Sequence, residues 1–216
     1  MRLILIFLSF FLSVSAWASQ PFFVPKGSLE YEVERNGEII GAQRVDFKNN
    51  ADKLIVNTSS NISVTFFGVP IYTFDQTTEE IWHGGMMISY KANALDGSSK
   101  KNLVLHRKGS KLVGTYNGKK RNIPGNIISS VLWRVDATKA NIILDAVNGK
   151  VKDTKAVKIG EDMVKVGDKE VLAAHYQFSG EFNREAWYDQ DGHMVKAILT
   201  ARDGSKVTQI LKNIPN

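Results

Sequence analysis

The sequence predicts an all-β protein, in which a single antiparallel meander forms a curved half-barrel or open barrel with one or two short helices. Two observations predict this fold. Pairs built from Gly, Asn and Asp recur at short intervals after residue 27, and such pairs close tight hairpins because these residues tolerate positive φ. The segments between the pairs are rich in Val, Ile, Thr, Tyr and Phe, as strands are. This spacing is typical of an antiparallel sandwich or barrel.

Alternation of side-chain character favours strands over helices. Leu29, Tyr31 and Val33 alternate with three glutamates, and a strand would bury the first set while it exposes the second. A helix would scatter both sets around its surface. Over residues 194–201 both alternating sets are fairly apolar, which predicts a strand nearer the centre of the sheet.

Helix is expected to be scarce, and residues 119–144 interrupt the meander. Residues 126–133 follow Pro124 and Gly125 and are predicted to form a turn or two of helix. Residues 138–146 are compatible with a second short helix or with a strand. We expect the whole region to pack across one end of the sheet.

The N-terminus has the three parts of a secretory signal peptide. A short basic start precedes an apolar run over residues 3–14, and Ala16 and Ala18 place small residues where a signal peptidase reads them. The apolar run is shorter than the ~20 residues that a membrane-spanning helix needs. The sequence therefore predicts a signal peptide over residues 1–18, cleaved after Ala18, and a single antiparallel β domain over residues 19–216.

Composition narrows the class and the compartment. The 216 residues include no cysteine, which excludes disulfides, zinc–thiolate sites, iron–sulfur clusters and cysteine catalysis. An exported protein of this size without cysteine is compatible with a bacterial periplasm, and we expect that location. The formal net charge is +6, but nucleic acid is not an expected partner after export, and the sequence shows little interleaving of aromatic and basic residues.

Several hairpin and core segments carry a family resemblance. They are residues 27–33 (GSLEYEV), 36–41 (NGEIIG), 79–82 (EEIW), 166–171 (VGDKEV), 187–189 (WYD) and 203–207 (DGSKV). Together they resemble the bacterial domain-of-unknown-function family 6134, which is related to a second uncharacterised exported family, numbered 3108. The resemblance spans residues 27–211 and implies an exported, mostly β bacterial protein with no established activity. It also implies a fold similar to the open half-barrel of the periplasmic lipoprotein carriers, and it supplies no site residues.

No catalytic or metal-binding signature stands out, so we expect no enzyme activity, no cofactor and no metal. A serine nucleophile in a GxSxG elbow is absent. Residues 189–192 (DQDG) begin like a calcium loop but lack its later ligands, which favours a hairpin turn. A hydrolase would need His106 or His175 to meet a carboxylate in a pocket. Four histidines lie outside the local spacings of metal sites, namely His83, His106, His175 and His193.

Residues 64–74 (VTFFGVPIYTF) form an uncharged, strongly apolar stretch. One interpretation is a pair of core strands joined at a bulge near Gly68 and Pro70. The other is an apolar lip or inner wall that contacts a lipid or a membrane. Under the second interpretation, the candidate ligand-facing residues are Phe66, Phe67, Ile71, Tyr72, Phe74 and Trp82.

Basic residues cluster beside the predicted turns. They form either a solvated positive rim or a surface that attracts anionic headgroups and cell-wall polymers. The residues of this candidate basic rim are Lys100, Lys101, Arg107, Lys119, Lys120 and Arg121.

These features predict a non-enzymatic periplasmic protein that binds or carries a hydrophobic ligand such as a lipid or acyl chain. The alternative is a structural or interaction protein of the cell envelope with no small-molecule ligand, which holds a protein partner through a sheet edge or residues 119–133. A contact with the membrane surface is compatible with the prediction, whereas no transmembrane span is expected in the mature chain.

Overall fold

The structure is a computed structural model that describes residues 24–25, 27–201 and 203–214. The predicted signal peptide, residues 1–18, lies outside the described residues. Within the described part, no helix combines the length and the apolar character needed to cross a membrane.

Strands make up most of the described chain, with one short 3₁₀ helix. The elements are β1 (Leu29–Arg35), β2 (Glu38–Asn50), β3 (Lys53–Phe66), β4 (Val69–His83), β5 (Met86–Asp96), β6 (Ser99–Lys108), β7 (Lys111–Tyr116), β8 (Lys119–Pro124), β9 (Ile128–Ser129), η1 (Val135–Lys139), β10 (Ile142–Leu144), β11 (Val151–Val166), β12 (Lys169–Gly180), β13 (Arg184–Tyr188), β14 (Met194–Thr200) and β15 (Lys206–Leu211).

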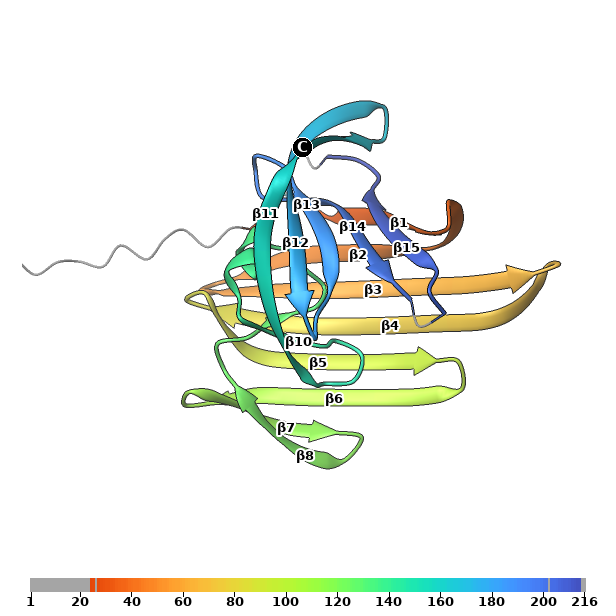
Figure 1. The fold of residues 1–216 in the computed structure, drawn as a ribbon. Helices are drawn as coiled ribbons and strands as arrows, with labels where there is room; N and C mark the ends of the chain where they lie inside the picture. Colours follow the sequence, from red (N-terminus) through yellow and green to blue (C-terminus); the bar gives the residue numbers. More distant parts are fainter. Residues whose placement is uncertain (1–23, 26, 202, 215–216) are drawn as a thin grey trace, which may run out of the picture.

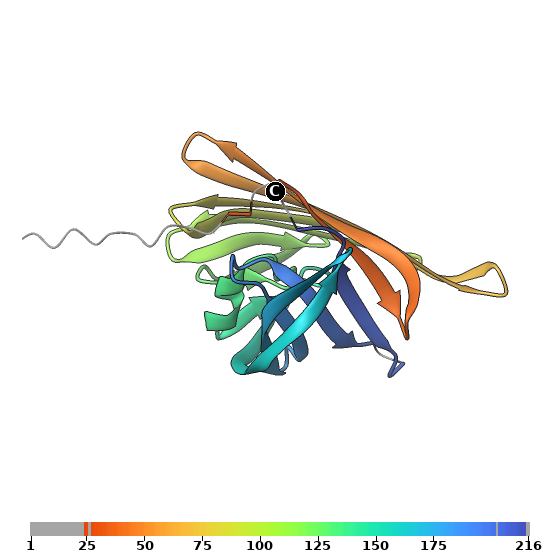
Figure 2. The ribbon, with the colours of Figure 1, turned by 90° about the horizontal axis from the view of Figure 1, so that it is seen from above.

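All strands belong to one 15-stranded sheet, in the order β8 to β1, then β15 to β9. Neighbours are antiparallel, apart from the parallel pair β9 and β10. The strands after β8 fold back over one face of β1–β8, so the curved sheet makes two layers (Figures 1 and 2). The end strands β8 and β9 do not pair with each other, and the sheet stays open. The predicted all-β meander is confirmed.

The core lies between the two layers and follows the predicted alternation. Leu29, Tyr31 and Val33 are at most 1% exposed. The hydroxyl of Tyr31 donates to the carbonyl of Met194 over 3.0 Å, which satisfies a polar atom inside the core. In β14 the neighbouring residues Met194 and Val195 are both fully buried, as expected for a strand covered on both faces.

Tight turns explain most of the hairpins. Asn36 and Asn117 adopt positive φ (51° and 47°), each followed by a glycine that also has positive φ, as two-residue hairpin turns require. One pair of turn-forming residues, Asn49 and Asn50, does not form the turn that this pattern predicts. Asn49 and Asn50 belong to β2, and the turn falls on the next two residues because Asn50 still pairs with Lys53.

Between β8 and β10, the helix lies at a different place in the chain from the one that the sequence predicts. Residues 126–133 form no helix, because Ile128 pairs with Ile143 of β10 in a parallel bridge. The 3₁₀ helix η1 lies just beyond that segment, and the core of the second predicted segment, residues 142–144, is strand β10. Tertiary pairing therefore overrides the local helical pattern here.

Candidate functional site

A groove of about 840 Å³ lies between the two layers. One wall comes from the ends of β1–β6, and the other comes from residues 130–152 and from the segments around β13–β15. Its apolar lining includes Ile62, Val64, Phe74, Val131, Phe182 and Leu199. The curvature of the sheet makes this hollow, because the second layer does not fill it at this end.

The structure brings only part of the predicted ligand-facing set to the groove. Ile71, Tyr72 and Phe74 line it. Phe66 and Phe67 lie further out, at the tip of the β3–β4 hairpin, where they are 62% and 92% exposed. These exposures rule out the interpretation of residues 64–74 as a pair of core strands.

Trp82 belongs to the buried core rather than to the groove. It is 3% exposed, and its indole Nε1 donates to the carboxylate of Glu80 over 2.8 Å. Trp133 Nε1 donates to the same oxygen over 3.0 Å, and Ser129 donates to the other carboxylate oxygen. Burial raises the pKa of Glu80, while these three donors and the charge of Arg134 oppose the rise. This carboxylate joins core elements, and it does not line the groove.

Most of the basic side chains that line the groove form ion pairs with neighbouring carboxylates. Arg35 pairs with Asp203 and Lys101 pairs with Asp96. Lys152 Nζ lies 2.6 Å from Asp145 Oδ2. Each of these cations therefore carries its own counter-charge at the groove wall.

Arg184 is the exception among the groove-lining cations of the described residues, because it makes no ion pair with a carboxylate there. Its Nη1 donates to the carbonyl of Ser130 over 3.3 Å, and its guanidinium carbon lies 4.1 Å from the ring centroid of Phe182. Its Nε is buried, and no acceptor within the described part of the chain reaches it.

The surroundings of Arg184 favour the binding of an anionic ligand. Burial lowers its pKa to about 10, and the charge of Asp145 is the largest influence that opposes this shift. Asp145 is itself engaged by Lys152 and by the backbone N–H groups of Val147 and Asn148. The guanidinium therefore stays charged at neutral pH without a carboxylate of its own, a condition that an anion in the groove would relieve.

The second layer holds a histidine between two carboxylates. His175 Nδ1 lies 3.0 Å from Asp162 Oδ2, and its Nε2 lies 2.9 Å from Glu185 Oε2. The imidazole stacks on Trp187 with ring centroids 3.9 Å apart. None of these four residues lines the groove.

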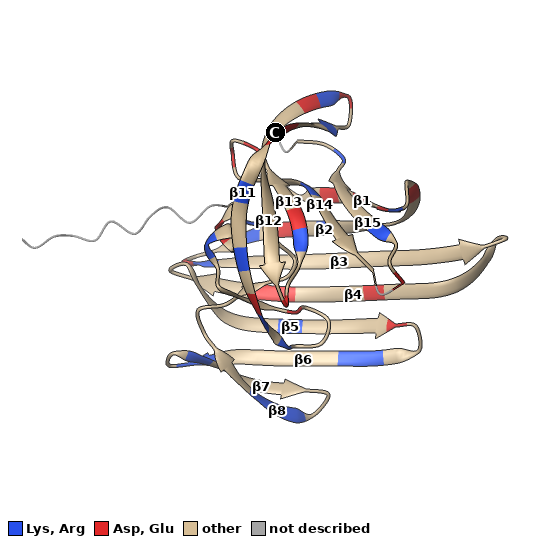
Figure 3. Cartoon of the chain, in the orientation of Figure 1, with Lys and Arg blue, Asp and Glu red and all other residues tan. Residues whose placement is uncertain are grey.

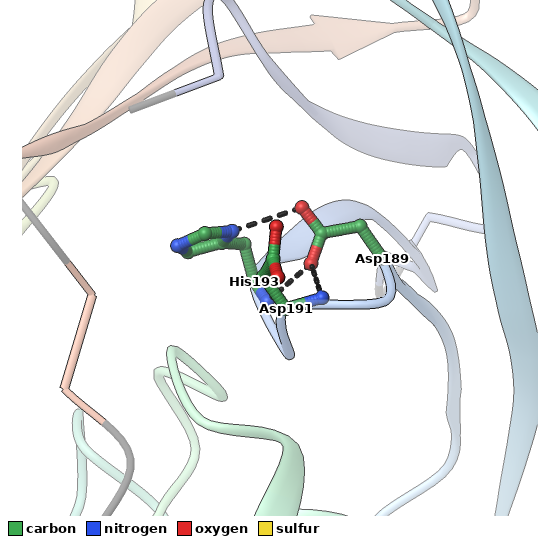
Figure 4. Close-up of side chains that lie close together, drawn as sticks. All are labelled: Asp189, Asp191 and His193. Atoms are coloured by element: carbon green, nitrogen blue, oxygen red, sulfur yellow. Dashed lines mark hydrogen bonds and ion pairs between the residues drawn. The ribbon is translucent and has the colours of Figure 1, made fainter. Parts of the chain in front are cut away.

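Asp189, Asp191 and His193 gather at the β13–β14 turn (Figure 4), with one ligand atom from each within 4.8 Å of the others. A cation could in principle use these three groups. Asp189, however, already accepts hydrogen bonds from the backbone N–H groups of Asp191 and His193, and its other oxygen lies 2.9 Å from His193 Nδ1. The arrangement is that of a side chain capping its own turn, as the sequence predicted for residues 189–192.

Comparison with known families gives one match. The model of the family DUF6134, described as a domain of unknown function, matches residues 31–212. The chain belongs to this family. No curated protein matches the chain.

The DUF6134 match extends from β1 to the end of β15, so it includes both layers and the groove between them. The family description assigns no activity.

The candidate basic rim of this DUF6134 chain divides between the two ends of the sheet. Arg107 lies at the β6–β7 end and is structural, because it donates to the carbonyls of Met87 (2.8 Å) and Gly125 (2.6 Å). At the opposite end Lys101 is held by Asp96, and Arg121 lies 5.3 Å from the ring of Tyr116. The other three members of the candidate basic rim lie at that opposite end and are exposed, namely Lys100, Lys119 and Lys120.

Sequence reasoning missed Arg184 and Gln43. Gln43 lines the groove with a buried Nε2 that has no hydrogen-bond partner among the described residues, while its Oε1 accepts from Ser60 and Gln209. Neither residue stands in a motif. Their importance depends on which acceptors surround them, and those acceptors come from segments far apart in the chain.

Proposed function

We propose that this chain is a non-catalytic binding protein that holds an acyl chain or a similar hydrophobic ligand in the groove between its two layers. The observation that carries the proposal is the groove itself, whose volume of about 840 Å³ lies within the range of ligand pockets, roughly 300–1,000 Å³. Each methylene group of the ligand that moves from water to the apolar walls would contribute about 0.8 kcal/mol to the free energy of binding.

Arg184 supports a ligand with an anionic head, such as a carboxylate or a phosphate. An acidic head group beside the guanidinium would supply the counter-charge that Arg184 lacks within the described protein. Charge-assisted hydrogen bonds of this kind contribute about 1.5–3 kcal/mol. The apolar lining would hold the tail, and Arg184 would hold the head.

The proposal includes a location, the periplasm of a bacterium. The leader pattern of residues 1–18 and the lack of cysteine favour it. A periplasmic binder of acyl chains would shield them from water between membranes or enzymes.

The test has two parts. The protein is purified under mild conditions from the compartment in which it accumulates, and native mass spectrometry followed by organic extraction identifies any bound lipid. Displacement of a fluorescent acyl probe then measures affinity for wild type and for Phe74→Asp, which places a charge on the groove wall. We expect a loss of affinity of about tenfold or more.

Leu172→Asp is the matched control, because Leu172 is 56% exposed on β12 and does not line the groove. It should bind the probe as wild type does. If the protein carries no lipid and wild type fails to bind the probe, the carrier proposal is wrong. Cross-linking for a protein partner in the envelope would then follow.

A further inference from the structure

The β3–β4 hairpin continues beyond the rest of the sheet as a two-stranded ribbon, residues 63–72. The last pair between β2 and β3 is Gly41 with Ile62, and the last pair between β4 and β5 is Phe74 with Asp96. Beyond these points β3 and β4 pair only with each other, ending at Phe66 with Val69. At ~3.3 Å per residue, the ribbon projects about 15 Å from the sheet, as Figures 1 and 2 show.

The ribbon is apolar although it stands in solvent. Phe67 is 92% exposed, and Phe66, Val69 and Ile71 are each more than 60% exposed. Residues 63–74 include no charged side chain, and Figure 3 shows this end of the hairpin without blue or red. Projecting strands are normally protected by charged residues, because unprotected edges and apolar surface invite association. An uncharged apolar ribbon therefore indicates a contact surface.

The turn of the ribbon retains a phenylalanine where the backbone favours asparagine. Phe67 and Gly68 have φ of 49° and 78°. The corresponding pairs at two other hairpins are Asn-Gly, with Asn36 at 51° and Asn117 at 47°. Positive φ is disfavoured for a bulky residue and tolerated by asparagine. Among the described residues, Phe67 is also the most exposed large apolar one, and a strained residue of this kind fits a role in binding rather than in folding.

Charge and shape identify the partner. Antiparallel pairing places the β3–β4, β5–β6 and β7–β8 turns at one end of the sheet, where Lys100, Lys119 and Lys120 are exposed. A protein interface normally surrounds its apolar centre with a polar rim, whereas the ribbon has no charged residue. An apolar tip with lysines set back from it suits a bilayer that has anionic headgroups.

We infer that the ribbon inserts its tip, centred on Phe66 and Phe67, into the surface of an anionic lipid bilayer while the lysines of the neighbouring turns contact the headgroups. Insertion stops at the boundary between headgroups and acyl chains, because the unpaired edges of a two-stranded ribbon cannot enter hydrocarbon. Ile71 and Tyr72 belong to both the ribbon and the groove wall, so the groove opens beside the bilayer. The inference does not depend on whether the groove holds a ligand.

Fluorescence at the tip tests the inference. Phe67→Trp is made in the form of the chain that the cell accumulates and is mixed with vesicles of phosphatidylethanolamine and phosphatidylglycerol whose acyl chains are brominated. The tryptophans of the described part, Trp82, Trp133 and Trp187, are at most 4% exposed, and wild type gives their baseline. We expect bromine to quench the added emission by about half or more, and less in vesicles of phosphatidylcholine or in high salt.

Met163→Trp is the matched control, because Met163 is 59% exposed on β11, away from the ribbon. Its emission should not change. Phe67→Asn should weaken vesicle binding by about tenfold or more while the fold is kept, because it removes the phenyl ring that would enter the bilayer and suits the turn. The inference is overturned if bromine leaves residue 67 unquenched. It is also overturned if Phe67→Asn dissolves a dimer seen without vesicles, or if residue 67 cross-links to a protein in the absence of lipid.

Discussion

Trp133 donates a hydrogen bond of 3.0 Å to Glu80, a residue 53 positions earlier in the chain. Both residues are buried, and the bond joins β4 to the segment that crosses from β9 to η1. The indole N–H therefore reaches a carboxylate inside the core, where bonds to charged groups are strong and unpaired groups are costly. This bond is one of several that hold the irregular segment across the sheet, together with those from Ser129 to Glu80 and from Tyr188 to the carbonyl of Leu132.

Trp133→Phe should destabilise the fold. It keeps most of the aromatic volume but removes one donor from a buried carboxylate, at a cost of about 1–3 kcal/mol. Trp187→Phe is the matched control, because Trp187 Nε1 donates to Asp162, whose side chain is 53% exposed. Urea unfolding should show a clearly smaller loss for Trp187→Phe. Equal losses in the two variants would contradict the role given to Glu80.

Glu80 should make stability depend on pH. Burial raises the pKa of Glu80 above its ordinary value of 4.5, so the folded protein holds this proton more tightly than the unfolded chain does. Its contribution to stability is therefore fully present below 4.5, falls as pH rises through the folded-state pKa, and then levels. Glu80→Gln has no such titration. Urea unfolding from about pH 4 to about pH 8 should show wild type losing stability relative to Glu80→Gln, and a constant difference would refute the prediction.

Gly41 should not tolerate a side chain. A Cβ there would lie 2.0 Å from the carbonyl oxygen of Asn61 and 2.9 Å from the Cα of Ile62, so β2 and β3 would have to separate. Gly41→Ala is expected to cost about 1–3 kcal/mol. Gly160→Ala is the control in another strand, because a Cβ at Gly160 meets nothing within 4 Å. Thermal unfolding should leave Gly160→Ala unchanged or slightly more stable.

Arg184 should determine which head group the groove prefers. Wild type is expected to bind dodecanoate and dodecyl phosphate about tenfold or more tightly than dodecanol, because the guanidinium lacks a carboxylate partner in the described protein. Arg184→Met should remove this preference while Arg184→Lys keeps part of it. Calorimetry would check both. If wild type binds the three ligands equally, Arg184 is not the anchor, although the groove would remain a binding site.

Phe67→Asn should increase stability, because asparagine tolerates the φ of 49° that phenylalanine adopts there. The expected gain is about 1 kcal/mol. The reverse exchange at the matching turn, Asn36→Phe, should destabilise by a similar amount, since Asn36 has a φ of 51°. Differential scanning calorimetry of both variants would measure the changes. A loss of stability in Phe67→Asn would show that the phenyl ring supports the fold rather than a contact.

Local pattern was sufficient for the strands and turns. Leu29, Tyr31 and Val33 are buried as their alternation predicts, because side chains on a strand alternate between two faces wherever that strand lies. Asn36 and Gly37 form the predicted turn because the positive φ that the turn requires is a local property of those residues. The family, too, could be recognised from hairpin and core segments.

The local sequence pattern could not predict which part of a strand is covered by its neighbours in the sheet. Trp82 and Phe67 are both large aromatic residues of the β3–β4 hairpin, yet Trp82 is 3% exposed and Phe67 is 92% exposed. The difference arises because β2 and β5 accompany the hairpin at Trp82 and end before Phe67. The lengths of the neighbouring strands and the packing of Trp133 against Trp82 decide this.

The sequence by itself determined the all-β class, the strand alternation, most of the turns and the membership of DUF6134. The tertiary structure alone decided that β9–β15 fold back over β1–β8, that a groove remains between them, and that Arg184 lies in its wall beside Ser130 without a carboxylate partner among the described residues. The physical reason is that turn and strand preferences act within a few residues. Burial and charge pairing depend instead on segments that meet only when the sheet curls.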